Sequence, residues 1–255
     1  MTALAIVLGL AIGTIVGAVG GGGAILALPV LIYVLGEPVG PASTASLVVV
    51  SVAAAMGAGS LARHGRVCWR LAFTFAAPAA AGSLLGTLAS NNVGADALVL
   101  AFVPVMLAAA LATWRGSDED SDGGCPHPPL RRVVAAGLLV GAMTGFFGVG
   151  GGFVIVPVLT LWLGAPFRRA VATSLVIICL TGVAALTSHL LAGAKPDLQA
   201  TVILAGSTAA GALLGTHLGE GLPQTALRRG FATLVSVVAL ALLLDVLVLG
   251  GPPAE

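Results

Sequence analysis

The sequence predicts an all-α polytopic membrane protein with two inverted repeats, each a Gly-rich helical hairpin followed by three transmembrane helices. Composition is the first observation behind this class: hydrophobic residues make up 58% of the 255 residues and charged residues 8%, against about 25% in soluble domains. The second observation is that the charges leave eight uncharged runs, and the third is that the two halves repeat. The composition excludes a water-soluble globule, and a net charge of +1 excludes a nucleic-acid-binding protein.

Six uncharged runs each suit one crossing, because about 20 apolar residues span the hydrocarbon layer. They predict transmembrane helices at 42–62, 67–90, 95–114, 170–192, 198–219 and 226–249. The runs 1–36 and 133–167 are too long for one helix, which would extend past about 50 Å.

Each long run contains glycines that disfavour a helix, so we predict hairpins with arms at 3–19 and 24–36, and at 132–147 and 153–164. These arms are short, so the hairpins either cross the membrane or turn inside it as re-entrant segments.

Residues 115–132, RGSDEDSDGGCPHPPLRR, are acidic and rich in Gly and Pro, which is typical of a soluble linker. The expected units are therefore a first membrane repeat at 1–114, this linker, and a second membrane repeat at 133–255. Cys68, Cys125 and Cys179 are widely spaced and form no CxxC, so we expect no disulfide framework, no zinc site and no other metal or cofactor. The first residues lack a basic segment before the apolar stretch, so no removable signal peptide is expected.

The two halves share a glycine pattern. GTIVGAVGGGGAILALPVL in the first half returns 128 residues later as GAMTGFFGVGGGFVIVPVL, and AGSLLGT at 81–87 returns as AGALLGT at 210–216. A register sustained over so many residues predicts an internal duplication.

The distribution of Lys and Arg distinguishes inverted from parallel repeats. If each long run crosses once, the repeats are parallel and the basic residues divide seven to four between the two sides. If each run returns to its own side, the repeats are inverted and the division is ten to one, with only Lys195 opposite the rest. Basic residues concentrate on the cytoplasmic side, so we predict inverted repeats, both termini outside and the linker in the cytoplasm.

Inverted repeats with interrupted helices are a recurrent plan of secondary transporters, which bind substrate near the membrane midplane. Glycines expose backbone N–H groups, and a helix that starts after the turn adds partial positive charge, so the hairpin tips suit a small anion. Close helix packing is the alternative role for these glycines, and back-bonding to a carbonyl is the alternative for the hydroxyls of the next helix. The candidate substrate-binding residues are Gly20, Gly21, Gly22, Gly23, Thr44, Ser46, Gly148, Gly150, Gly151, Gly152, Thr173 and Ser174.

Two prolines follow the glycine clusters at the same distance. Pro29 and Pro157 each lie six residues after a cluster and are predicted to kink the returning arm. No catalytic residues are expected, because the sequence contains no Asp/Glu pair, Ser/His/Asp set or HExxH placed for chemistry.

The paired glycine stretches, the GxP turn that follows them, the small hydroxyl segment and the repeated AGxLLGT resemble the TauE/SafE family of sulfite and organosulfonate exporters. The resemblance covers essentially the whole chain except 115–132. It implies a multi-pass permease of the bacterial or archaeal inner membrane that moves a small sulfur-containing anion, such as sulfite or an organosulfonate, by alternating access.

Two other functions are kept open. One is an intramembrane enzyme acting on a lipid-phosphate carrier, which would need acidic residues and an Arg/Ser pair that the hairpin tips do not carry. The other is a passive anion channel. The expected partners are a small anionic substrate and membrane lipid, without nucleic acid. Proton or sodium coupling, the direction of transport and homo-oligomerisation are left open.

Overall fold

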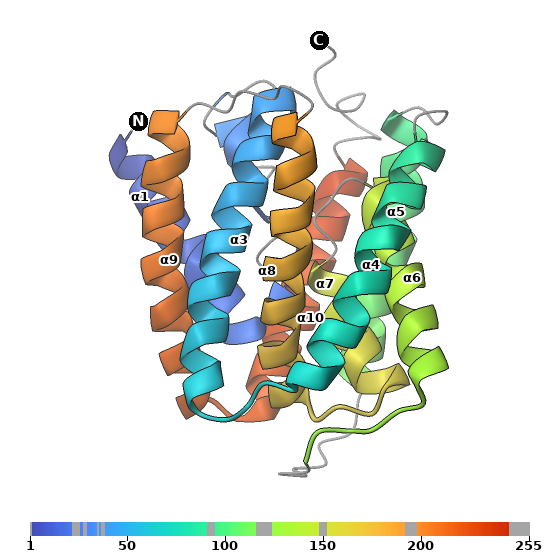
Figure 1. Ribbon diagram of the computed structural model, residues 1–255. Helices are drawn as coiled ribbons and strands as arrows, with labels where there is room; N and C mark the ends of the chain where they lie inside the picture. The colour runs from blue at the N-terminus through green and yellow to red at the C-terminus, as the bar shows by residue number, and fades with distance from the viewer. Residues whose placement is uncertain are drawn as a thin grey trace.

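The computed structural model describes residues 2–21, 26–27, 30–34, 36, 39–90, 95–115, 124–147, 152–191 and 198–244. Every regular element within these ranges is helical, which confirms the all-α prediction (Figure 1). The α-helices are α1 (Thr2–Val19), α3 (Val39–Arg63), α4 (Trp69–Ser90), α5 (Ala95–Arg115), α6 (Leu130–Phe147), α7 (Gly152–Pro157), α8 (Phe167–Leu191), α9 (Leu198–Gly221) and α10 (Gln224–Leu244). Two short π-helical segments, η2 (Val30–Val34) and η3 (Val158–Trp162), lie in the returning arms.

The helices have the length and surface of membrane-spanning segments. Among the described residues, four stretches are long and apolar enough to cross a bilayer: Pro41–Arg63, Phe167–Thr187, Thr201–Gly221 and Gln224–Leu244. Large apolar side chains also point outward, and Leu84, Leu85 and Val202 are each more than 60% exposed. Such an apolar exterior matches lipid rather than water, so the protein is a polytopic membrane protein.

The predicted helix boundaries agree with the structure to within a few residues. The largest differences at helix starts are in α3 and α8, which begin three residues before the predicted positions. Pro41 lies in the first turn of α3, and the carbonyl of Pro166 accepts the N–H of Ala170 at the start of α8 (2.8 Å). Proline is compatible with the first turn of a helix, so these residues open the two helices.

The two halves start from opposite ends of the bundle. Figure 1 shows α1 and α3 both starting at the upper end, whereas α6 and α8 both start at the lower end. Helices α4 and α10 run upward, and α5 and α9 run downward. Each long uncharged run therefore returns to the end where it began, which is the chain direction that inverted repeats require. The helix ends that carry all ten described Lys and Arg residues lie at the lower end, called the basic end below.

Helices from different halves pair closely. Helix α1 packs along α9, and α6 packs along α4, while α3 contacts α8 and α5 contacts α10. In the repeat, α6 of the second half corresponds to α1 of the first, and α9 corresponds to α4. The pairs α1–α9 and α6–α4 are therefore equivalent contacts, as a twofold relation between the repeats would produce.

Glycines make the α1–α9 and α6–α4 contacts possible. A Cβ atom at Gly13 or Gly17 of α1 would collide with a backbone carbonyl of α9, and a Cβ at Gly141 or Gly145 of α6 would collide with a carbonyl of α4. The four carbonyls are, in the same order, those of Thr208, Ala212, Ala79 and Ser83. The contacts recur at sequence offsets of 128 and 129, so these repeated glycines serve close backbone packing.

A disulfide joins Cys68 to Cys125, so the expectation of no disulfide was wrong. The Cα atoms are 5.6 Å apart although 57 residues separate the two cysteines. Helices α4 and α5 go up and back between them, and this returns residue 125 to the start of α4 at the basic end. The spacing of the two cysteines along the sequence does not reveal this contact, because it depends on how α4 and α5 fold between them.

Candidate functional site

The two Gly-rich turns meet inside the bundle. Gly21, two residues after the end of α1, and Gly152, the first residue of α7, lie backbone to backbone. A Cβ at Gly21 would collide with the carbonyl of Gly152, and a Cβ at Gly152 would lie 2.9 Å from the Cα of Gly21. The structure therefore brings together a residue from each of the two predicted hairpin tips.

Gly20 ends α1 in a conformation that favours glycine. Its φ is +83°, and its N–H donates to the carbonyl of Val16 (2.9 Å). A Cβ at this position would lie 2.9 Å from the Oγ of Ser174 and 3.4 Å from the Cα of Val171. The tip of the first half thus lies against the early part of α8, where two of the predicted hydroxyl residues are located.

The predicted hydroxyl residues have different partners. Thr44, Thr173 and Ser174 are buried, whereas Ser46 is half-buried. The hydroxyls of Ser46 and Ser174 donate to carbonyls one turn earlier, those of Ser43 and Val171 (2.8 Å each), so both show the back-bonding that was the alternative role.

Thr173 has a partner outside its own helix. Its Oγ1 accepts the backbone N–H of Cys68 (3.1 Å), which ties α8 to the start of α4. Because this oxygen accepts, its hydroxyl proton can still be donated to a ligand. Thr173 therefore differs from Ser174, whose proton is used by a carbonyl in this structure.

Several predicted residues lie outside the described part of the chain: Gly22, Gly23, Pro29, Gly148, Gly150 and Gly151. Pro157 is described and is the last residue of α7. The helix changes there from α to the π form of η3, so the returning arm changes its hydrogen-bond pattern at this proline.

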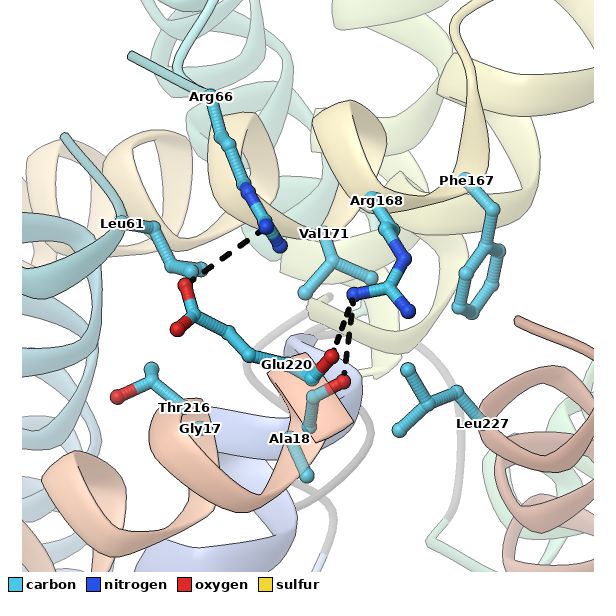
Figure 2. Close-up of a pocket in the computed structure, with 11 residues that line it drawn as sticks. Gly17, Ala18, Leu61, Arg66, Phe167, Arg168, Val171, Thr216, Glu220 and Leu227 are labelled. Carbon is cyan, nitrogen blue, oxygen red and sulfur yellow. Dashed lines mark hydrogen bonds and ion pairs between the residues drawn. The ribbon is translucent and has the colours of Figure 1, made fainter. Parts of the chain in front are cut away.

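A small cavity lies between the tips and the basic end. Its volume is about 20 Å³, and Gly17 and Val171 form part of its wall next to the tips (Figure 2). This volume holds about one water molecule. Charged side chains from both halves complete the wall at the basic end: Arg66, Arg168 and Glu220.

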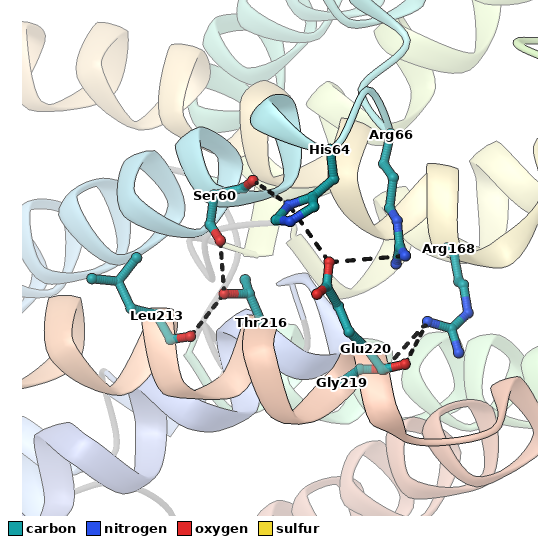
Figure 3. A network of polar contacts seen from close by, with 8 residues as sticks. All are labelled: Ser60, His64, Arg66, Arg168, Leu213, Thr216, Gly219 and Glu220. Atoms are coloured by element: carbon teal, nitrogen blue, oxygen red, sulfur yellow. Dashed lines mark hydrogen bonds and ion pairs between the residues drawn. The ribbon is translucent and has the colours of Figure 1, made fainter.

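These charged residues contact neighbouring groups at the basic end. Arg66, between α3 and α4, has its Nη2 3.8 Å from the Oε1 of Glu220 in the last turn of α9 (Figure 3). The Nδ1 of His64 lies 3.6 Å from the same oxygen. Arg168 of α8 donates to the carbonyls of Gly219 and Glu220 (3.4 Å each), at the end of α9, and to that of Leu222 (2.6 Å).

The Glu220 carboxylate is the acidic group of this cavity wall. Its Oε1 is buried and makes no hydrogen bond to any described residue, so the Arg66 guanidinium interacts with it mainly through charge. The pair is partly exposed, and such pairs contribute about 1 kcal/mol or less to stability. Two arginines beside one carboxylate leave local positive charge, which attracts anions.

Sequence reasoning missed this charged cluster, since it used the arginines only to set the topology and did not consider Glu220. A signal was present in the repeat alignment. Arg168 and Glu220 align with the uncharged Gly40 and Asn91 of the first half, at offsets of 128 and 129. Departures from the repeat at helix ends would have identified both residues.

A helical membrane bundle in which two interrupted hairpins from opposite ends meet at the centre has the architecture of a secondary transporter. The comparisons with known proteins agree with this class. The chain belongs to the TauE/SafE family, because the family model described as "Sulfite exporter TauE/SafE" matches residues 5–242. The protein is a membrane transporter of that family.

Curated relatives carry the same general description. A "Probable membrane transporter protein" of Xylella fastidiosa (strain Temecula1) is 33% identical over 241 residues, which cover 90% of each chain. A probable membrane transporter protein of Methanocaldococcus jannaschii is 30% identical over 200 residues, covering 75% of this chain and 73% of that protein. The Bacillus subtilis protein YunE, also described as a probable membrane transporter, is 26% identical over 232 residues, covering 82% and 85%. No solved structure matches significantly.

Proposed function

We propose that this transporter carries a small sulfur-containing anion, such as sulfite or an organosulfonate, by alternating access, and binds it near the midplane between the two Gly-rich tips. The observation that supports this most directly is the meeting of Gly20 and Gly21 with Gly152 beside the buried hydroxyl of Ser174. Glycine backbone and hydroxyl groups can surround an oxyanion with N–H and O–H donors without burying a cationic side chain. In this structure the Ser174 hydroxyl donates to the carbonyl of Val171, so in the proposal it turns to the anion when the anion binds. The family description, sulfite exporter, supports the substrate class.

In this proposal the structure represents a closed state. A cavity of about 20 Å³ has no room for sulfite, so the anion must enter after the helices separate. The contacts of Glu220 with Arg66, and of Arg168 with the end of α9, form the gate at the basic end. When this gate opens, the two arginines become available to attract an anion towards the tips.

The proposed orientation places the basic end in the cytoplasm of a bacterial or archaeal cell, with both termini outside the inner membrane. The support for it is the ten-to-one division of basic residues. A fusion of alkaline phosphatase to Glu255 should be active, and a fusion of green fluorescent protein there should be dark. A fluorescent fusion would contradict the orientation.

Transport by purified protein in liposomes tests the function itself. Sulfite should accumulate against its gradient, in competition with sulfoacetate or taurine, and an uncoupler or ionophore that removes the driving gradient should abolish accumulation. Flux that only follows the sulfite gradient would instead support the passive channel. The transporter description of the family favours transport over the enzyme acting on lipid-phosphate carriers.

Ser174→Ala tests the binding site. If the hydroxyl contacts the anion, sulfite should bind about 1 kcal/mol more weakly, measured by the ligand-induced rise in melting temperature. Thr187→Ala is the matched control, because Thr187 back-bonds in the same helix but is exposed. Equal affinity in well-folded Ser174→Ala and Thr187→Ala proteins would reject the proposed site at the tips.

A further inference from the structure

A second cavity at the basic end has the Cys68–Cys125 disulfide in its wall. Its volume is about 330 Å³, far larger than that of the closed cavity beside Glu220. The start of α4, the end of the linker and the start of α6 form it. This space is large enough to admit a small molecule to the sulfur atoms.

Two arginines lie at the disulfide. Arg70 lines the cavity and is exposed, and no Asp or Glu is among the described lining residues. Arg169, in the first turn of α8, donates from Nη1 to the Sγ of Cys125 (3.8 Å) and to the carbonyl of Gly65 (3.2 Å). The two guanidinium groups are therefore expected to attract a small anion to the sulfur atoms.

The two sulfur atoms are not equivalent. Cys125 is half-buried in the non-helical segment before α6, whereas Cys68 is only 2% exposed. Cys68 directly precedes α4, and its carbonyl accepts the N–H of Ala72 (2.9 Å), so it caps the N-terminus of a 22-residue helix. The partial positive charge at a helix N-terminus stabilises a thiolate. Cys125 is thus the sulfur better placed for attack, and Cys68 the better leaving group.

We propose that the Cys68–Cys125 disulfide is a reaction site for small anionic sulfur nucleophiles that enter through this cavity. With sulfite as the probe, the sulfur of SO₃²⁻ attacks the Sγ of Cys125 and forms a new S–S bond. The Cys68–Cys125 bond breaks, and its electron pair remains on the Sγ of Cys68 as a thiolate. The product is a Cys125 S-sulfonate beside Arg169 and a Cys68 thiolate at the start of α4, so the two negative charges of sulfite are shared between the two sites.

Opening the disulfide would free the linker from a residue that contacts α8 beside the tips. The linker is bonded to Cys68, and the N–H of Cys68 donates to Thr173, which neighbours Ser174 in α8. Disulfides are rare in the reducing cytoplasm and are usually reactive there. Any effect of this opening on transport rests on the proposed function and orientation. The reaction of the disulfide with a nucleophile depends on neither.

The test uses the full-length protein carrying Cys179→Ser, purified in detergent without reductant. Peptide mapping should show the Cys68–Cys125 disulfide, and sulfite should add the mass of one SO₃ group to the Cys125 peptide while freeing one thiol at Cys68. Glutathione, an anionic thiol, forms the second arm and should give a mixed disulfide at Cys125. Reaction with both supports a site open to anionic sulfur nucleophiles, and reaction with sulfite alone supports a site restricted to the small oxyanion.

Arg70→Gln tests the role of the cavity. At low salt it should slow the reaction with sulfite by about two- to fivefold, and leave almost unchanged the reaction with cysteamine, whose attacking form is a net-neutral zwitterion of ammonium and thiolate. Arg63→Gln is the matched control, since Arg63 is an exposed arginine at the same end that does not line the cavity.

Three results would overturn the proposal. These are absence of the disulfide from the oxidised protein, S-sulfonate on Cys68 instead of Cys125, and equal slowing by Arg70→Gln and Arg63→Gln. None of these measurements involves transport. Any of the three results would therefore overturn the disulfide proposal without affecting the proposed transport function.

Discussion

The helix interfaces of the bundle and its basic end differ in how far the two halves match. Along α1–α9 and α6–α4, a glycine in one half has a counterpart with the same carbonyl contact in the other half. At the basic end this correspondence is lost, because Arg168, Glu220 and the Cys68–Cys125 disulfide have no matching groups. The matched region forms the close helix interfaces, and the unmatched region carries the charged cluster and the disulfide.

This difference separates two kinds of effect on substitution. Changes in the matched interfaces remove space between backbones, so they should reduce stability in both halves alike. Changes at the basic end alter partly exposed side chains, so they should affect access and reactivity more than stability.

The largest expected effect comes from filling a helix interface. Gly17→Val would place a side chain against the carbonyl of Ala212, and Gly145→Val would do the same against Ser83. Each should destabilise the protein by at least about 1–3 kcal/mol, because overpacking forces the backbones apart. The melting temperature and the yield of monodisperse protein in detergent provide the measurement.

The control is Gly206→Val in α9, where an added Cβ would meet no atom within 4 Å. Its stability should stay within about 0.5 kcal/mol of the original. A large loss for Gly17→Val together with a small loss for Gly145→Val would show that the two interfaces are not equivalent.

A smaller effect is expected from Glu220→Gln, which removes the negative charge beside Arg66. Stability should fall by less than about 1 kcal/mol, because the pair is partly exposed. The proposed gate should open more often, so a thiol introduced by Thr216→Cys in the cavity wall should be alkylated severalfold faster. Thr216 is 3% exposed in this structure and is therefore a sensitive reporter.

Arg63→Gln in the same Thr216→Cys background is the control for charge removal at this end of the protein. It should leave the alkylation rate unchanged, since Arg63 is exposed and lies outside the cavity. Unchanged alkylation in folded Glu220→Gln protein would show that Glu220 does not help to close the basic end.

The smallest effect is expected from deleting 117–123, which lies outside the described residues. This stretch contains no apolar period, so it should contribute little to packing, and the deletion keeps Cys125 for its bond to Cys68. Melting temperature and sulfite flux should both remain close to those of the intact chain. Loss of flux with normal stability would assign the acidic run a regulatory role.

The sequence predicted the features that depend on local physics. Uncharged runs set the helix boundaries, because a charge inside the membrane is costly. The glycine clusters marked where helices are interrupted, and the distribution of arginines predicted chain directions that the helices follow in Figure 1.

Features that depend on which helices face each other could not be predicted in this way. Cys68 and Cys125 meet only because α4 and α5 go up and back between them, and Glu220 meets Arg66 only because the end of α9 packs near that of α3. The glycine pattern was also ambiguous until the fold was known. Gly13 and Gly17 pack against α9, whereas Gly20 and Gly21, only a turn further on, lie at the meeting point of the tips.

The direct backbone contacts of α1 with α9, and of α4 with α6, have a mechanical consequence. A close-packed interface without intervening side chains transmits a displacement instead of absorbing it. Helix α1 is therefore expected to move together with α9, and α4 together with α6. Each pair joins a helix that precedes the linker to one that follows it, so a displacement that begins in either half of the chain is passed directly to the other half.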